Sequence, residues 1–271
     1  MGPVVLITGC SSGIGRATAE LLSRAGYEVV ATARRPDDLA GLEVGLTLAL
    51  DVIAQASIDA ALAAVLDRYG RIDALINNAG YAALGTIEEV PDDAVRRLYD
   101  VNVFGVLAMI RGVAPLMRAQ RSGRIVLLSS VAGKLPTPGN GIYASSKSAV
   151  EALGDALRLE LGPHHVNVSI IEPGPVDTAF NTTASRLSDA RISDPTSPYR
   201  ALYRLVDQFS QTMRDRQATP DEVARAIQRA LEDKRPNARY VVGFSLPGRV
   251  MLRTRDLLWG PVAARMFAHR P

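Results

Sequence analysis

A chain of 271 residues with 47% hydrophobic and 22% charged residues has the length and composition of a globular α/β protein that buries a substantial core. Its formal net charge of +3 comes from arginines dispersed along the chain, which argues against nucleic-acid binding. The single cysteine, Cys10, excludes an internal disulfide, and that thiol with three scattered histidines offers no spacing typical of a metal site.

Short apolar segments alternate with longer amphipathic ones up to residue 173. The segments rich in Val, Ile and Leu, which predict strands, are 4–8, 28–32, 46–50, 73–77, 124–129 and 166–171. The helical patterns between them are 13–25, 55–69, 92–119 and 143–161. Continuous apolar strands are typical of a parallel sheet covered on both faces. The alternation therefore predicts an α/β fold, a doubly wound Rossmann-type parallel sheet with helices on both faces.

We expect a single domain over residues 1–271, in which three parts have different tasks. Residues 1–173 would form the cofactor-binding and catalytic core. Residues 174–218 are polar and irregular, with a helix predicted at 203–215, and have the composition of a surface loop that covers a substrate. Residues 219–271 would form a C-terminal helix, a strand and a tail.

In the C-terminal part, Thr219 and Glu222 predict a capping box at the start of a helix over 219–233. A strand is predicted at 239–243, followed by an apolar tail rich in arginine. The tail has two interpretations: a packed segment with exposed arginines, or a helix that covers the substrate or contacts a membrane surface. With no secretory signal and no long uncharged apolar segment, we expect a cytoplasmic protein that is not integral to a membrane.

The first predicted strand leads through "TGCSSGIG", residues 8–15, into a helix. Glycines at such a turn let the backbone approach a ligand, and the helix N-terminus offers free N–H groups to a phosphate. The loop predicts a site for a dinucleotide pyrophosphate, although its glycine spacing differs from G-x-G-x-x-G and a tight turn without a ligand is the alternative. The predicted contacts are Gly9, Ser11, Ser12, Gly13, Ile14 and Gly15.

The end of the second strand indicates which dinucleotide binds. An acidic residue at that position would bind a ribose 2′-hydroxyl, but this chain has Ala33 followed by Arg34 and Arg35. Guanidinium groups pair well with a 2′-phosphate, so NADP is expected to be preferred, with NAD as the alternative. The nearby Asp37 and Asp38 are expected in the first turn of a short helix, where carboxylates are favourable.

Tyr143 and Lys147 are four residues apart in a predicted helix, so their side chains lie on the same face. Lys147 is one of three lysines among 31 basic residues, which hints that an ammonium is needed there. An ammonium stabilises a phenolate, so we expect it to lower the pKa of Tyr143. A phenol tuned in this way suits carbonyl reduction, which needs a proton donor beside the substrate oxygen.

Several motifs follow one another over about the first 180 residues. They are the glycine loop, "NNAG" at 77–80, Asn102 in "DVNVFG", "SS" at 129–130, "YASSK" at 143–147 and "PGPVDT" at 173–178. In this order the sequence resembles the short-chain dehydrogenase/reductase family. The resemblance implies that Tyr143 is the catalytic acid or base and that Lys147 is its partner and a ribose ligand. It also implies that Ser130 holds the substrate oxygen.

The same resemblance assigns Asn102 to a water-linked proton path, although an asparagine in a long helix can instead bond a neighbouring backbone. It implies cofactor contacts beside the adenine, along the adenosine ribose and around the nicotinamide, where Val176 and Thr178 would fix the carboxamide. These contacts are Asp51 and Val52, then Asn78, Ala79 and Gly80, and finally Pro173, Gly174, Val176 and Thr178. No metal site is expected.

By this resemblance the protein is an NADP(H)-dependent oxidoreductase that interconverts an alcohol and a ketone or aldehyde by hydride transfer. A small to medium apolar carbonyl or alcohol compound is the expected substrate. The resemblance also implies a homodimer or homotetramer that pairs through helices 92–119 and 143–161. The alternative is a dinucleotide-binding redox sensor or scaffold without catalysis, and the presence of Asn102, Ser130, Tyr143 and Lys147 together argues against it.

Overall fold

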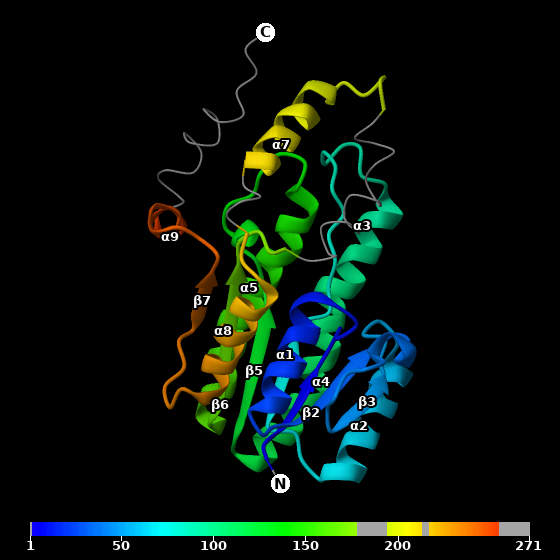
Figure 1. The fold of residues 1–271 in the computed structure, drawn as a ribbon, viewed down its shortest axis with the longest axis vertical. Coiled ribbons are helices and arrows are strands. Elements are labelled where there is room, and N and C mark those ends of the chain that lie inside the picture. The colour runs from blue at the N-terminus through cyan, green and yellow to red at the C-terminus, as the bar shows by residue number, and fades with distance from the viewer. Residues whose placement is uncertain (1, 178–193, 213–216, 255–271) are drawn as a thin grey trace.

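A parallel sheet of seven strands organises the computed structural model, which describes residues 2–177, 194–212 and 217–254 (Figure 1). The strands are β1 (Val4–Ile7), β2 (Glu28–Ala33), β3 (Leu46–Ala49), β4 (Ala74–Asn77), β5 (Gly123–Leu128), β6 (Val166–Pro173) and β7 (Arg239–Val242). They lie in the order β3-β2-β1-β4-β5-β6-β7. Because the order reverses between β1 and β4, a crevice for a ligand is expected at their carboxyl ends.

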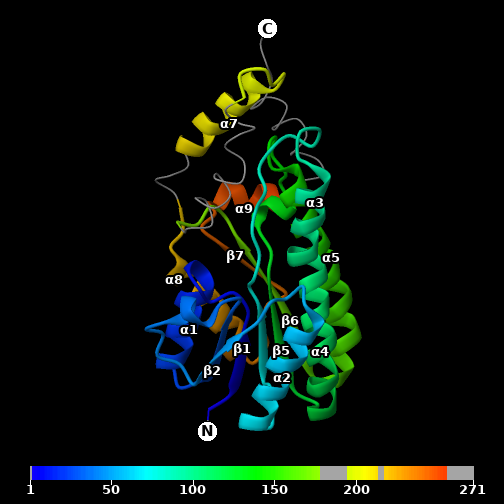
Figure 2. The same ribbon diagram turned by 90° about the vertical axis from the view of Figure 1, so that its right-hand side faces the viewer.

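Helices cover both faces of the sheet, with α1 and α8 on one face and α2, α4 and α5 on the other (Figure 2). The helices are α1 (Gly13–Arg24), α2 (Gln55–Tyr69), α3 (Asp92–Tyr99), α4 (Val106–Gln120), α5 (Gly141–Leu161), α7 (Arg200–Thr212), α8 (Pro220–Glu232) and α9 (Leu246–Arg253). Short 3₁₀ turns are η1 (Pro36–Leu39), η3 (Val131–Gly133) and η4 (Gly162–His164). The predicted fold class is therefore confirmed.

The long helix predicted at 92–119 is not continuous. Between α3 and α4 the chain forms a π-helical turn, η2 (Asp100–Gly105). A π-helical turn changes the direction of the side chains that follow it, and such turns occur frequently at functional sites. The hydrophobic pattern of the sequence continues through this turn, so periodicity alone did not reveal it.

Among the described residues, one helical run, 92–120, is long and apolar enough by length and composition to cross a membrane. Its α4 section buries Val106, Met109, Val113 and Met117 in the core against the sheet. Packing against the sheet accounts for the apolar composition of this run. The C-terminal tail, which had two interpretations, begins with α9, and its part from residue 255 lies outside the described residues.

The predicted capping box at the start of α8 is present. The Thr219 backbone N–H donates to Glu222 Oε2 at 2.8 Å, and the Glu222 backbone N–H donates to Thr219 Oγ1 at 3.2 Å. The buried face of α8, which includes Val223 and Ile227, packs in the same core as α1 and the sheet. The cap therefore supports the layer that carries the glycine loop.

We expect Thr219→Ala to lower the free energy of unfolding by about 1 kcal/mol, because it leaves N–H groups of the first turn of α8 without a partner. Equilibrium unfolding in urea measures this change. Glu222→Gln is the matched control, since glutamine also completes a capping box and should leave the stability nearly unchanged. Equal losses in the two variants would contradict the role of the cap.

Candidate active site

The glycine loop joins the end of β1 to the start of α1. Ser12 is the N-cap of α1, and its side chain makes no capping hydrogen bond, so the first N–H groups of the helix have no side-chain partner. Gly9 has a φ of 75°, which favours glycine, and a Cβ there would lie 2.9 Å from the Ala79 Cα. A Cβ on Gly15 would lie 2.2 Å from the Gly9 carbonyl oxygen. The loop therefore packs too tightly for any side chain at these two positions.

Asn78 ties the glycine loop to the end of β4. Its side-chain Nδ2 donates to the carbonyl oxygens of Thr8 and Gly9, each at 2.8 Å. In return, Thr8 Oγ1 accepts from the backbone N–H groups of Asn78 and Ala79, each at 3.0 Å. The structure thus brings the predicted contacts of "NNAG" beside the glycine loop, at the point where the strand order reverses.

The two arginines that follow β2 differ in their pairing with other residues. Arg35 is paired with Asp38 through Nη2 to Oδ1 at 2.8 Å and Nε to Oδ2 at 3.2 Å. Arg34 is exposed and makes no hydrogen bond or ion pair with any residue of the described part of the chain. Asp37 and Asp38 lie in the first turn of η1, as predicted. Of the two predicted cations, Arg34 is the one available to an added phosphate.

Asp51 and Val52 follow β3 at the same edge of the sheet. Asp51 Oδ1 accepts the Ile53 backbone N–H at 3.2 Å, which fixes the turn before α2. Val52 is buried, and its side chain lies so close to the backbone of η2 that a Cβ on Gly105 would come within 2.7 Å of its Cγ2. These two predicted adenine contacts therefore lie on a rigid turn.

Tyr143, in the first turn of α5, is only 9% exposed and packs with Ala82, Ala132 and Ala144. Burial raises the pKa of the phenol to about 12, and a hydrogen bond with Ser130 acts in the opposite direction. Ser130 is also held in place by the backbone, because its Oγ donates to the Pro173 carbonyl oxygen at 3.3 Å. The structure thus brings together two of the predicted catalytic groups, the Tyr143 phenol and the Ser130 hydroxyl.

Lys147 lies beside Tyr143, with its Nζ 5.8 Å from the centre of the tyrosine ring. The ammonium donates to the Leu128 carbonyl oxygen at 2.7 Å. Burial lowers the pKa of Lys147 to about 8, while the charge of Glu151 raises it. The expected net lowering of the Tyr143 pKa is not seen in this structure, because loss of solvent around the phenol outweighs the hydrogen bond with Ser130.

Asn102, on the π-helical turn, uses its side chain to hold other elements. Its Nδ2 donates to the Tyr81 carbonyl oxygen at 2.9 Å and to Ser146 Oγ at 3.1 Å, and its Oδ1 accepts the Tyr81 N–H at 3.1 Å. These contacts match the alternative stated for Asn102, a bond to neighbouring backbone. The water-linked proton path stays a prediction.

Gly80 joins the cofactor half of the site to the catalytic half. A Cβ on Gly80 would lie 3.1 Å from Asn102 Oδ1 and 3.6 Å from Lys147 Nζ. Pro173 ends β6 at the same edge, and the Gly174 N–H donates to the Val242 carbonyl oxygen at 2.8 Å. Val176 forms a bridge to Ala218, which keeps this predicted nicotinamide segment close to the sheet.

Part of the predicted site lies outside the described residues. Thr178 is in this part, as are residues 179–193 and 213–216 of the predicted substrate loop. The described section of that loop is held by Tyr203 of α7, whose hydroxyl donates to Glu89 and accepts the Thr86 N–H at 2.9 Å. This helix therefore lies over the loop that follows β4.

Sequence reasoning missed the residues that support the catalytic side chains. Ser146 and the backbone of Tyr81 are the partners of Asn102, and Glu151 acts on Lys147. The spacing of Lys147 and Glu151, four residues apart on one helix, was the available signal for the last of these. Backbone partners such as Tyr81 leave no signal in the residue types.

Two other sequence questions concern Cys10 and metal binding. Cys10 is buried in the core, and burial raises its pKa to about 12, which suits a packing residue rather than a reactive thiol. In the described part of the chain no cluster of His, Cys, Asp and Glu could hold a metal ion.

The arrangement fits a nicotinamide dinucleotide. The N-terminus of α1, without a side-chain cap, can receive a pyrophosphate, and the exposed Arg34 carries a positive charge at the end of β2. At the other end of the same sheet edge, Lys147 offers an ammonium and Tyr143 a phenol. A dinucleotide needs anion-binding groups at one end and proton-transfer groups at the other, and both are present.

Comparisons with known proteins agree with this chemistry. The family model described as short chain dehydrogenase matches residues 3–188. A 3-ketodihydrosphingosine reductase from Bacteroides thetaiotaomicron is 35% identical over 269 residues, covering 98% of this chain and 96% of the relative. The 17-beta-hydroxysteroid dehydrogenase type 1 of Homo sapiens is 36% identical over 253 residues, covering 88% of this chain and 76% of the relative.

A solved structure of a short-chain dehydrogenase/reductase from Burkholderia phymatum in complex with NAD has a TM-score of 0.77 to this chain at 28% identity. The superposition covers 100% of this chain and 97% of that chain. These matches extend over most of the chain, including the residues that carry the glycine loop, Tyr143 and Lys147. The chain therefore belongs to the short-chain dehydrogenase/reductase family and is an NAD(P)-dependent oxidoreductase.

Proposed function

We propose that the protein is an NADP(H)-dependent enzyme that interconverts a secondary alcohol and a ketone, or a primary alcohol and an aldehyde. Tyr143 is the proton donor and acceptor, Lys147 and Ser130 assist it, and Asn102 supports the proton path. The observation that carries this proposal is the buried phenol of Tyr143, which is bonded to Ser130 and lies against the Lys147 ammonium.

When bound, the nicotinamide supplies the hydride in reduction and accepts it in oxidation. Burial raises the pKa of Tyr143 to about 12, so the phenol is protonated at physiological pH. Its hydroxyl can therefore donate a proton to a carbonyl oxygen. Ser130 orients that oxygen through its hydroxyl. As the phenolate forms, the adjacent Lys147 ammonium stabilises it, and each unit of pKa lowering corresponds to about 1.4 kcal/mol.

The preference for NADP rests on Arg34. Its guanidinium is exposed and unpaired within the described residues, whereas Arg35 is already paired with Asp38. Ala33 ends β2 where an acidic residue would select a ribose 2′-hydroxyl. A charged group that is free of internal partners binds an added phosphate without first breaking an ion pair.

An apolar, lipid-like carbonyl or alcohol compound is the substrate class that we propose. The two relatives named above are a reductase of a keto lipid and a dehydrogenase of a hydroxysteroid, and both names describe an oxygen function on an apolar skeleton. Leu202 and Leu205 of α7, within the predicted substrate loop, are half-buried. These observations support an apolar surface over the site.

We also propose a cytoplasmic homodimer or homotetramer that pairs through the helical segments 92–119 and 143–161. In support, Phe104 of η2 is 57% exposed, and Leu159 on α5 is 79% exposed. Exposed large apolar side chains on neighbouring helices suit an interface between subunits.

Tyr143→Phe is expected to lower the rate of NADPH-dependent reduction by about 10²- to 10⁴-fold, because the proton donor is removed while the ring remains. Absorbance of NADPH with a panel of ketones and aldehydes measures the rate, and fluorescence titration should show that NADPH affinity is retained. Tyr99→Phe is the matched control, since the Tyr99 hydroxyl only contacts Ser145 at the surface. Undiminished turnover in Tyr143→Phe would rule out the proposed mechanism.

Arg34→Ala is expected to weaken NADPH binding about 10- to 100-fold and to leave NADH binding nearly unchanged, because a charge-assisted bond to the 2′-phosphate contributes roughly 1.5–3 kcal/mol. Dissociation constants from fluorescence titration with both dinucleotides test this. Arg35→Ala is the control and should have the smaller effect, since its guanidinium is held by Asp38. Equal weakening of NADPH and NADH in Arg34→Ala would contradict the NADP preference.

A further inference from the structure

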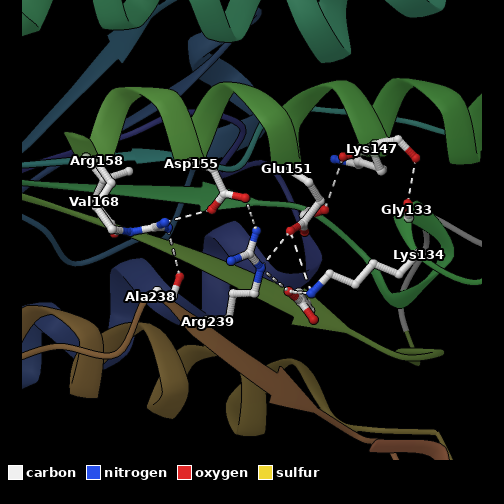
Figure 3. A network of polar contacts seen from close by, with 12 residues as sticks. Gly133, Lys134, Lys147, Glu151, Asp155, Arg158, Val168, Ala238 and Arg239 are labelled. Carbon is white, nitrogen blue, oxygen red and sulfur yellow. Dashed lines mark hydrogen bonds and ion pairs between the residues drawn. The ribbon is translucent and has the colours of Figure 1, made fainter. Parts of the chain in front are cut away.

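Four charged side chains meet between α5, which carries Tyr143 and Lys147, and the sheet. They come from α5, the turn after η3, β6 and β7 (Figure 3). We name Lys134, Glu151, Glu172 and Arg239 the charge cluster. Arg239 Nε lies 3.0 Å from Glu151 Oε2 and 3.0 Å from Glu172 Oε1, and Lys134 Nζ lies 2.5 Å from Glu172 Oε1. Glu151 and Glu172 are both buried. Removing two carboxylates from water is costly, so their positions call for a physical reason.

Glu151 links this cluster to the proposed catalytic site. It lies on α5 one turn after Lys147, and both side chains are buried on the sheet side of the helix. One of its carboxylate oxygens, Oε2, is held by Arg239 and lies 3.8 Å from Lys134 Nζ. The other, Oε1, is buried without a hydrogen-bond partner. Arg239 therefore holds the Glu151 carboxylate at a fixed place, one turn of α5 from the lysine.

Lys147 needs such a charge because its surroundings disfavour an ammonium. The ammonium is buried and donates to the neutral carbonyl group of Leu128. Burial lowers the pKa of Lys147 to about 8, and among the described residues Glu151 is the carboxylate whose charge opposes this effect. Without that charge, a larger share of Lys147 would be neutral near physiological pH.

The other groups around Lys147 do not replace Glu151. Tyr143, on the same helix, is neutral because burial raises its pKa to about 12. Asn102 of the π-helical turn carries no charge. Glu172 of β6 forms ion pairs with both Lys134 and Arg239, and burial together with the charge of Glu151 raises the pKa of its carboxyl group. The remaining polar groups, at the carboxyl end of β5, are the Leu128 carbonyl and the hydroxyls of Ser129 and Ser130.

We propose that Glu151 is a positioning residue for the reaction: its carboxylate keeps Lys147 in the charged form that stabilises the Tyr143 phenolate, and Arg239 holds that carboxylate in place. The proposal rests on the proposed function, in which Lys147 assists Tyr143. It assigns a role in the reaction to Arg239 of β7, which reaches the site only through Glu151.

A purely structural role is the competing explanation, and Asp155 separates the two. Asp155 lies one turn after Glu151 on α5 and also binds Arg239, at 2.7 Å from its Nη2, but its side chain is 50% exposed. It stands two turns from Lys147. Glu151→Gln and Asp155→Asn each remove one negative charge and one ion pair with Arg239. Asp155→Asn also removes an ion pair with Arg158, and it does so at a more exposed position farther from the lysine.

The first measurement follows Lys147 itself in the protein without cofactor. The chain has three lysines, so labelling with lysine ¹³C at the ε-carbon gives three signals, which Lys234→Arg and Lys147→Arg assign. We expect Glu151→Gln to lower the titration midpoint of Lys147 by about one pH unit. Asp155→Asn should leave it nearly unchanged. An unchanged midpoint in Glu151→Gln, or an equal shift in the two variants, would overturn the proposal.

The second measurement is the pH profile of kcat/KM for NADPH-dependent reduction of an apolar diketone such as 9,10-phenanthrenequinone. In the unmodified protein the rate should fall above about pH 8, where Lys147 loses its proton. In Glu151→Gln this fall should begin about one unit lower, in step with the shifted midpoint. Glu151→Asp retains the charge and should restore most of the profile. A shifted midpoint with an unshifted profile would show that Glu151 has no role in the reaction.

The outcomes distinguish this proposal from the one on which it rests. Activity that persists in Tyr143→Phe contradicts the proposed function, whatever happens to Lys147. Activity lost in Tyr143→Phe, with an unshifted Lys147 in Glu151→Gln, contradicts only the role of Glu151. Circular dichroism checks that Glu151→Gln folds, and Glu151→Asp supplies the comparison if its stability is reduced.

Discussion

Between α5 and the end of β5, the Lys147 ammonium donates to the Leu128 carbonyl oxygen at 2.7 Å in a place that excludes nearly all water. A buried ammonium is unfavourable unless nearby groups stabilise its charge. The neighbouring structure supplies them: a carbonyl at the carboxyl end of β5 and a carboxylate one turn along the helix. The position of α5 on the sheet therefore places Tyr143 beside Lys147, and it also places Glu151 beside Arg239 and Lys134.

Two asparagines hold the rest of the site in place around this helix. Asn78 joins the ends of β1 and β4, and Asn102 joins the loop after β4 to α5 through Tyr81 and Ser146. Both bind backbone groups near the point where the strand order reverses, and Asn102 also donates to the side-chain hydroxyl of Ser146. Because loops lack a hydrogen-bonding ladder of their own, amide side chains take over that task here. The dinucleotide end and the proton-transfer end are thereby held in one rigid edge.

The protonation states follow from burial more than from pairing. Tyr143 and Lys147 face each other, yet burial moves the pKa of the phenol upward and that of the ammonium downward. Loss of water favours the neutral form of each group. A hydrogen bond with Ser130 opposes this effect at Tyr143, and the charge of Glu151 opposes it at Lys147, but each recovers only part of it. In the proposed mechanism, a protonated phenol beside a lysine whose charge depends on its neighbours makes carbonyl reduction sensitive to the residues packed against that lysine. Under the proposed role of Glu151, strand β7, far from the glycine loop in sequence, acts on this chemistry through Arg239.

The amino-acid sequence by itself determined which segments along the chain become strands and helices, because this depends on local hydrophobic patterns. It also determined the glycine loop and the spacing of Tyr143 and Lys147, which are local motifs. It also allowed the Thr219 cap of α8 to be predicted, since a capping box involves residues three apart. Local pattern did not reveal the π-helical turn at Asp100–Gly105, whose apolar residues continue the helical periodicity. Nor did it separate Arg34 from Arg35, which differ only in the partner that η1 offers to one of them.

Tertiary structure alone decided the use of Asn102, the pKa of Tyr143 and the meeting of Glu151 with Arg239. Residues 151 and 239 come together only when β7 has paired with β6 beneath α5. The pKa of a side chain depends on how much water its surroundings exclude, and that is a property of the packed protein. Spacing along a helix brings two groups onto one face, but the assembled sheet determines whether they carry charge.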